Sequence, residues 1–336
     1  MDLEGAAWMV RNLGQCISTV HVYSTGVLAG GWDGRLMHWN IDGDHIWTAE
    51  TGDRIQSIII SGTNCYITSG LAVVALDEGV EVWRTNLEGS ADELALVNDE
   101  LIATSSVYDI EHEDFMESAI WRLSLTGEIL DCIKIDEKPW YFHADKGGTT
   151  LGIGRPRGGA LNISKEEITH IPLGDSPVTT GINGRKSSLL GTADGSVWSS
   201  CGENRGNHTI SIEHIICTEQ GYSVALEGGE VLNCDAKGNT IDSERGDPVV
   251  CLHDWNGPWI GRWNGFSGSI NYANDSWNCP RPRSFSSFEN KLGIGLEDGM
   301  IILLDWDLFE RRKGDKTKEK DSKKSALQAK LRALRS

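Results

Sequence analysis

The feature that most constrains this chain is a pair of tight hairpins between residues 27 and 50. Two Asp-Gly dipeptides, at 33–34 and 42–43, separate three short runs rich in apolar residues. Asp-Gly between such runs favours a hairpin, because the tight hairpin turn needs positive φ angles at both central positions. The stretch therefore predicts three consecutive antiparallel strands, at 27–30, 35–40 and 45–49.

The same layout recurs along the chain at spacings of about 35–40 residues, with one longer interval, which matches a four-stranded propeller blade. Each unit has an apolar run that ends in a small residue and precedes a turn, and a candidate innermost strand lies before it. The runs are VLAGG (27–31), YITSG (66–70), LIATS (101–105), LGIG (151–154), LLGT (189–192), VALE (224–227), WIGR (259–262) and LGIG (292–295). The pattern predicts an all-β fold, an eight-bladed β-propeller. The ring would have seven blades if the divergent third or seventh unit did not form one.

The two ends of the repeat region predict how the ring closes. The last unit, 284–306, lacks a fourth strand, whereas the first residues, LEGAAWMVRN, resemble the fourth strand of the first unit. In this comparison Trp8 matches Trp47. We expect the N-terminal strand to complete the last blade, because closure removes sheet edges that would otherwise pair with other chains.

Charge separates the chain into an acidic body and a basic tail. The net charge is −18, yet the segment from residue 311 to the end carries 11 basic and 3 acidic residues, which leaves −26 on residues 1–310. An acidic body is a poor surface for nucleic acid, so the tail is the only segment expected to bind nucleic acid.

The tail itself divides into two parts. We expect a β-propeller over 1–309, a disordered charged linker over 310–325 and a short amphipathic helix over 326–336. The leucines of the helix follow the i, i+4, i+7 spacing that suits a partner's groove, and basic residues stand beside them. This docking element comprises Leu327, Leu331, Leu334, Lys330, Arg332 and Arg335. The alternatives are a solvated tail and an anchor on RNA or the ribosome.

The tryptophan pattern resembles two propeller families. Trp39, Trp83 and Trp198, assigned to third strands, resemble the tryptophan of WD-repeat proteins, and the Asp-Gly…Gly…Trp rhythm and the number of units resemble the eight-bladed pyrroloquinoline-quinone-like propellers. The resemblance covers about residues 1–308, without the Gly-His dipeptide of WD repeats and with a degraded quinoprotein motif. Kinship with the second family would imply a quinone-dependent oxidoreductase with a Ca²⁺ ion, but no ligand set matches residue by residue. We interpret these tryptophans and Trp47 as packing residues.

Candidate binding residues lie on turns between second and third strands, which we expect at one face of the ring near its central channel. Arginines beside exposed aromatic side chains on an acidic body could bind an anionic group or an acidic peptide of a partner protein. These residues are Trp32, Asp33, Arg155, Arg157, Arg262 and Trp263. The alternative is that the arginines pair with neighbouring carboxylates.

Catalytic motifs are absent from the sequence: there is no nucleophile elbow, zincin motif, phosphate loop or dinucleotide fingerprint. The acidic stretch 107–119 lacks the spacing of a calcium loop. We therefore predict a non-catalytic scaffold for protein–protein interaction, without cofactor or metal.

The sequence also predicts a cytoplasmic protein. The first residues are acidic and lack the apolar segment of a signal peptide, and no run of about 18 apolar residues would span a membrane. The 8 cysteines stand singly in strand-like runs without a Cys-x-x-Cys pair, which favours buried free thiols in a reducing compartment.

Overall fold

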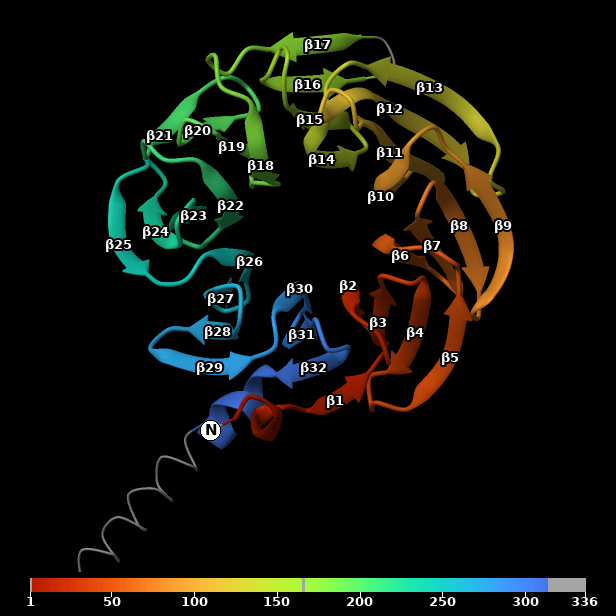
Figure 1. Ribbon diagram of the computed structural model, residues 1–336, viewed down its shortest axis with the longest axis vertical. Helices are drawn as coiled ribbons and strands as arrows, with labels where there is room; N and C mark the ends of the chain where they lie inside the picture. Colours follow the sequence, from red (N-terminus) through yellow and green to blue (C-terminus); the bar gives the residue numbers. More distant parts are fainter. Residues whose placement is uncertain (1, 165–166, 314–336) are drawn as a thin grey trace, which may run out of the picture.

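A computed structural model describes residues 2–164 and 167–313 of the chain. Eight four-stranded antiparallel sheets stand as blades around one axis (Figure 1). The strands of each blade are called a to d from the innermost to the outermost. The predicted eight-bladed β-propeller is confirmed, and the third and seventh units each form a complete blade.

Blades 1 to 4 follow one another in the sequence, each as four consecutive strands. They consist of β2 (Ile17–Tyr23), β3 (Gly26–Gly31), β4 (Arg35–Asn40) and β5 (His45–Glu50); β6 (Ile55–Ser61), β7 (Asn64–Ser69), β8 (Ala72–Asp77) and β9 (Val80–Asn86); β10 (Ser90–Val97), β11 (Glu100–Asp109), β12 (Asp114–Ser124) and β13 (Ile129–Ile135); and β14 (Pro139–Asp145), β15 (Gly148–Ile153), β16 (Ala160–Ile163) and β17 (Ile168–Ile171).

Blades 5 to 7 repeat this order, and blade 8 supplies three strands of its own. They consist of β18 (Val178–Ile182), β19 (Leu189–Thr192), β20 (Ser196–Ser199) and β21 (Asn204–Asn207); β22 (Ile212–Cys217), β23 (Gly221–Leu226), β24 (Glu230–Asp235) and β25 (Thr240–Arg245); β26 (Val249–Asp254), β27 (Pro258–Trp263), β28 (Gly268–Tyr272) and β29 (Asp275–Cys279); and β30 (Pro282–Phe288), β31 (Lys291–Leu296) and β32 (Met300–Asp305).

The N-terminal strand closes the ring, as the sequence predicts. Strand β1 (Met9–Asn12) pairs antiparallel with β32, Met9 opposite Leu303, and becomes strand d of blade 8. It is shorter than the resemblance suggests, because Glu4–Ala6 forms a turn of 3₁₀ helix before it. The pairing covers the edge of β32 that would otherwise be free.

Tryptophans from outer strands seal three neighbouring blade boundaries. The indole N–H groups of Trp8 and Trp83 donate to the carbonyls of Ile41 and Leu125 in the next blade, both at 2.9 Å. Between blades 1 and 2, the ring of Trp47 packs so closely on Gly79 that a Cβ added there would lie 2.9 Å from it. These tryptophans are therefore packing residues, and Trp83 lies on outermost strand β9 rather than on a third strand.

Trp39 and Trp198 also serve packing. Both lie on third strands, β4 and β20, as predicted. Trp39 is buried in the core cluster between blades 8 and 1, and Trp198 packs against the cluster between blades 4 and 5. The eight cysteines are free thiols, but only Cys65, Cys234 and Cys251 are buried, and Cys201 is exposed.

A β-bulge lies near the start of every innermost strand. The register of the a–b pair shifts there in all eight blades, for example between Pro139 and Tyr141 and between Pro282 and Ser284. A bulge adds an unpaired residue and re-aims its side chain. Trp140 and Arg283 are such residues, and both belong to the candidate site described below.

A short helix (residues 306–313) follows β32 and packs beneath blades 7 and 8. Phe309 is fully buried against the rings of Trp259 and Trp277. Residues 310–313 of the expected linker thus belong to this helix, whereas the remaining linker and the predicted amphipathic helix, 314–336, lie outside the described residues. Among the described residues, no helix is long and apolar enough to cross a membrane.

Candidate functional site

The two faces of the ring differ in their loops. Because the strands of each blade alternate in direction, the b–c turns and the d–a connections lie at one face, here called the b–c face, and the a–b and c–d turns lie at the other. Seven large exposed apolar side chains lie on the turns and strand ends of the b–c face, while most of the others lie on outermost strands. The seven are Trp32, Leu71, Tyr108, Ile110, Met116, Trp140 and Phe266. This face therefore offers apolar surface from several neighbouring blades.

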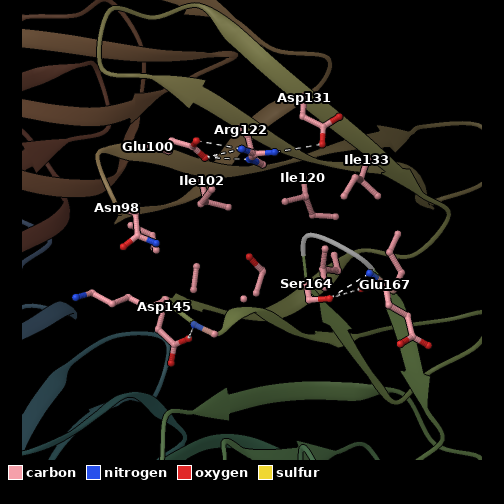
Figure 2. Close-up of a pocket in the computed structure, with 18 residues that line it drawn as sticks. Asn98, Glu100, Ile102, Ile120, Arg122, Asp131, Ile133, Asp145, Ser164 and Glu167 are labelled. Atoms are coloured by element: carbon pink, nitrogen blue, oxygen red, sulfur yellow. Dashed lines mark hydrogen bonds and ion pairs between the residues drawn. The ribbon is translucent and has the colours of Figure 1, made fainter.

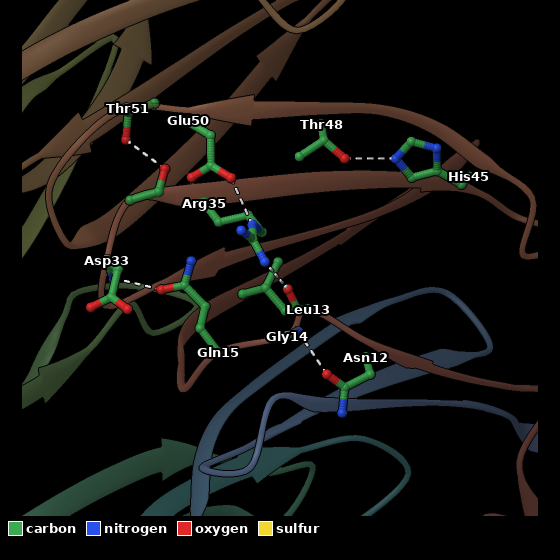
Figure 3. A network of polar contacts seen from close by, with 11 residues as sticks. Asn12, Leu13, Gly14, Gln15, Asp33, Arg35, His45, Thr48, Glu50 and Thr51 are labelled. Atoms are coloured by element: carbon green, nitrogen blue, oxygen red, sulfur yellow. Dashed lines mark hydrogen bonds and ion pairs between the residues drawn. The ribbon is translucent and has the colours of Figure 1, made fainter.

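The predicted residues Trp32 and Asp33 form the b–c turn of blade 1, which is held in place from two sides (Figure 3). The backbone N–H of Asp33 donates to Oε1 of Gln15 at 2.6 Å. Arg35, just after the turn, bonds Glu50 at 2.7 Å and the Leu13 carbonyl at 3.2 Å. These contacts tie the turn to the connection from the closing strand β1.

Two guanidinium groups share the ring of Trp32. The Cζ atom of Arg54 lies 4.2 Å from the ring centroid and that of Arg283 lies 5.6 Å from it. Nearby, Cζ of Arg281 lies 5.9 Å from the ring of Trp263. We call these five residues the arginine cluster. The arginine cluster contains side chains from blades 1, 7 and 8 and from the d–a connection before blade 2.

The charges of the arginine cluster are only partly compensated. Arg283 pairs with Glu297, but no hydrogen bond or ion pair joins the Arg54 guanidinium to another described residue. The Nε atoms of Arg54, Arg281 and Arg283 are all buried without a partner. Burial lowers the pKa of Arg54 and the like charge of Arg283 lowers it further, while the charge of Asp92 partly opposes the shift.

A second group of aromatic residues lies on the same face at blades 3 and 4. Lys138 Nζ stands 3.8 Å from the ring of Phe115 and 5.2 Å from that of Trp140. It also approaches the buried carboxylate of Asp92 at 3.8 Å. Burial lowers the pKa of Lys138, while the charge of Asp92 opposes the shift. This lysine therefore has a counter-ion within the fold, unlike Arg54.

The structure separates the arginines expected at this face. Arg262 is 2% exposed and bonds the Gly229 and Asp247 carbonyls, both at 2.7 Å, and Glu244. Arg157 forms a bidentate pair with Glu137 at 2.6 Å for both contacts. Arg157 and Arg262 therefore pair with neighbouring carboxylates, as the alternative in the sequence analysis stated.

Two other predicted residues, Arg155 and Trp263, remain at least partly exposed. Arg155 is exposed beside Arg157 and makes no hydrogen bond or ion pair within residues 2–164 and 167–313. Trp263 is half-buried next to Arg281. The tail residues Leu327, Lys330, Leu331, Arg332, Leu334 and Arg335 lie outside the described residues.

Sequence reasoning missed Arg54, Arg281, Arg283 and Lys138 as site residues. A signal was present, because Arg54, Lys138 and Arg281 each stand immediately before an innermost strand in the aligned repeats. The position of Arg283 depends on a bulge in strand β30, and the alternation of residues does not reveal a bulge. Within the described part of the chain, no three His, Cys, Asp or Glu side chains are grouped to hold a metal ion.

Comparison with known proteins gives the fold and nothing finer. No protein-family model and no curated protein sequence matches this chain. Among solved structures, Sqt1 of Saccharomyces cerevisiae superposes with a TM-score of 0.69 at 12% identity, covering 88% of this chain and 97% of that one. The fold of the chain is thus a β-propeller similar to that of WD-repeat proteins.

Two further propellers show the same likeness. BamB from Moraxella catarrhalis gives a TM-score of 0.67 at 13% identity, and the C-terminal WD40 domain of Sif2 gives 0.66 at 10% identity. Each comparison covers 88% of this chain and 98% of the other. Identities this low establish the architecture, so function has to be argued from the site.

Proposed function

We propose that this WD-repeat-like propeller is a non-catalytic platform for protein–protein interaction, and that its b–c face binds an acidic segment of a partner protein. WD-repeat-like propellers commonly act as interaction scaffolds. The exposed aromatic and aliphatic side chains of this face supply apolar contact area, and buried aromatic and arginine side chains are the usual energetic centres of protein interfaces.

One observation carries the proposal: Arg54 and Arg283 both lie against the ring of Trp32, and the Arg54 guanidinium forms no hydrogen bond or ion pair with a described residue. A carboxylate of a partner would accept hydrogen bonds from the guanidinium groups and relieve their mutual repulsion. Arginine and carboxylate suit each other because two parallel N–H···O bonds form at once. The rest of residues 1–310 is strongly acidic, so this cluster differs in charge from its surroundings.

A direct test titrates the full chain with a fluorescein-labelled peptide of six glutamates flanked by tyrosines, with a hexalysine peptide as the charge control. Charged hydrogen bonds contribute roughly 1.5–3 kcal/mol each. We therefore expect Arg54→Gln to weaken binding of the acidic peptide by at least about tenfold. The matched control is Arg245→Gln, which removes one charge from outer strand β25, where the side chain is 81% exposed.

The proposal fails if Arg54→Gln and Arg245→Gln bind the acidic peptide equally well. It also fails if the hexalysine peptide binds as tightly as the acidic one. Thermal unfolding of both variants is the check on folding, and neither change removes an apolar core contact.

The C-terminal segment 326–336 is the second part of the proposal. We propose that it serves as a docking element, on the basis of its leucine spacing and its basic residues. Deleting 314–336 would then abolish an interaction while leaving the melting temperature nearly unchanged.

A further inference from the structure

A cavity of about 430 Å³ opens between blades 3 and 4, away from the b–c face. It lies beside the a–b turn at Asn98, the a–b turn at 146–147 and the c–d end of β16 (Figure 2). Its size falls in the range of pockets that bind small ligands or several side chains of a peptide. None of the residues of the arginine cluster lines it.

An aspartate stands at this blade boundary, where a tryptophan covers each of the boundaries between blades 1 and 2 and between blades 2 and 3. In the c–d ladders of blades 1 to 3, the last pair before the register shift is His38 with Trp47, Ala75 with Trp83, and Arg122 with Asp131. Trp47 and Trp83 cover the next blade boundary, as described above. Asp131 stands at the corresponding position in blade 3 and is too short to do so. The boundary between blades 3 and 4 is open at its outer part.

The lining combines an apolar floor with a charged rim. The floor consists of side chains from both blades, among them Ile102 and Ile120, which are 8% and 3% exposed, together with Val97, Ile133, Ile163 and Ile168. Arg122 on the rim bonds Glu100 at 2.8–3.0 Å and approaches Asp131 at 3.7 Å (Figure 2). Four acidic and two basic side chains line the cavity, so its rim is negative.

We propose that this cavity, the blade 3–4 groove, receives the C-terminal segment 326–336 of this chain. The segment carries three leucines at i, i+4 and i+7, which suit an apolar floor, and three basic residues, which suit the acidic rim. A helix of eleven residues is marginal in water, so docking would supply the stability that the isolated segment lacks. The inference rests on the docking role proposed for this segment and is independent of the b–c face.

The position of the chain end agrees with the proposal. The helix 306–313 starts at the c–d end of β32, so the chain leaves the described structure at the same side of the ring as the groove. Residues 314–325 span at most about 40 Å when extended. Blades 3 and 4, which border the groove, lie across the ring from blade 8 in Figure 1. The experiment below therefore also identifies which copy of the chain supplies the segment.

Cross-linking of the full-length protein tests the proposal. Lys330 lies in the segment and Lys146 lines the groove, so an amine-reactive cross-linker followed by mass spectrometry should join them. We expect this product in preference to a link from Lys330 to Lys237, which lies on a c–d turn of blade 6, fewer blades away from the chain end. Mixing isotope-labelled and unlabelled protein shows whether the two lysines belong to one molecule or to two.

Two variants test docking, one by changing the groove and the other by changing the C-terminal segment. Asp131→Trp places in blade 3 the residue that closes the preceding boundaries, and it should fill the groove without lowering the melting temperature. Leu327→Ala combined with Leu331→Ala and Leu334→Ala removes the apolar anchors and keeps every tail charge. Each should lower the Lys330–Lys146 yield by at least about tenfold.

The proposal is overturned if the yield is the same in wild type and in the leucine variant, or if Lys330 links to Lys146 and Lys237 with equal frequency. Charge attraction alone would give both results, since the acidic body attracts the basic tail wherever they meet. Loss of peptide binding at the arginine cluster would leave this result untouched, so the two proposals fail separately.

Discussion

Replacing Arg157 by methionine would show whether this arginine is a structural partner or a binding residue. Its Nε and Nη2 atoms lie 2.6 Å from the two carboxylate oxygens of Glu137, which is 0% exposed, while the Arg157 side chain is 46% exposed. Methionine keeps the apolar stem and removes the charge, which leaves a buried carboxylate without its counter-ion. The structural interpretation therefore predicts a loss of stability.

The size of the loss follows from the burial of the two groups. Breaking a fully buried ion pair costs about 3–5 kcal/mol. Because Arg157 is half-exposed, water can reach part of the vacated space, and we expect about 2–3 kcal/mol. For a domain of about 310 residues this corresponds to a decrease in melting temperature of roughly 3–5 °C.

The pH dependence gives a second, independent signature. Burial alone would raise the pKa of Glu137, but the hydrogen bonds and charge of Arg157 outweigh it and hold that pKa below its usual value. In the wild type this contributes stability above the unfolded-state pKa, about 4.3, and the contribution is lost as pH falls through the folded-state pKa. In Arg157→Met only backbone hydrogen bonds still oppose the effect of burial on the pKa of Glu137. The carboxyl of the folded variant therefore binds its proton more tightly than that of the wild type, and the deficit should shrink as pH falls from 7 towards about 4.5.

Denaturant unfolding at several pH values measures both effects. Arg155→Met is the matched control, because Arg155 is exposed two residues away, and its replacement should change stability by no more than about 0.5 kcal/mol. Adding Glu137→Gln to Arg157→Met should recover part of the loss, since the buried charge is then gone. The reasoning is refuted if Arg157→Met unfolds like Arg155→Met, or if its deficit is the same at every pH.

Two further predictions concern the seams of the ring. Gly127 has φ +85° and a Cβ there would lie 2.7 Å from the Trp83 ring, so Gly127→Ala should cost about 2–4 kcal/mol in thermal or denaturant unfolding. Gly52, with φ +87° and no neighbouring atom within 4 Å, is the control, and Gly52→Ala should cost only about 1 kcal/mol. Equal costs for the two variants would contradict the close packing of Trp83 on Gly127. Deleting residues 1–12 removes β1 from β32 and uncovers Ile301 and Leu303, so size-exclusion chromatography should show self-association, and a stable monomer would contradict it.

Turn chemistry made the blades predictable from the sequence. Gly34 and Gly43 follow aspartates in the best-preserved unit, and both adopt positive φ, +86° and +89°. The expectation of positive φ at both residues of each Asp-Gly pair is wrong, because each glycine closes the turn and Asp33 and Asp42 keep negative φ. Such turns depend on neighbouring residues in the chain, so each copy of the repeat carries its own signal. The closing strand was predictable for a related reason. Trp8 packs across a blade boundary as Trp83 does, so both positions require a tryptophan and the similarity is visible in the sequence.

The candidate site was less predictable, because it depends on which side chains meet across blades. Arg262 and Arg54 look equally available in the sequence, yet Arg262 is enclosed by carbonyls of Gly229 and Asp247 and by Glu244. Arg54 instead lies against Trp32 from the neighbouring blade.

The sequence by itself determined the strands, their order and the closure of the ring, since turn residues and strand periodicity act over a few positions. Only the tertiary structure decided which arginines remain uncompensated and where the ring stays open. The contact between Trp83 and Leu125 joins residues 42 positions apart, and the groove opens where Asp131 stands in the place of such a tryptophan. Burial and charge pairing are properties of two blades together, so a single repeat does not encode them.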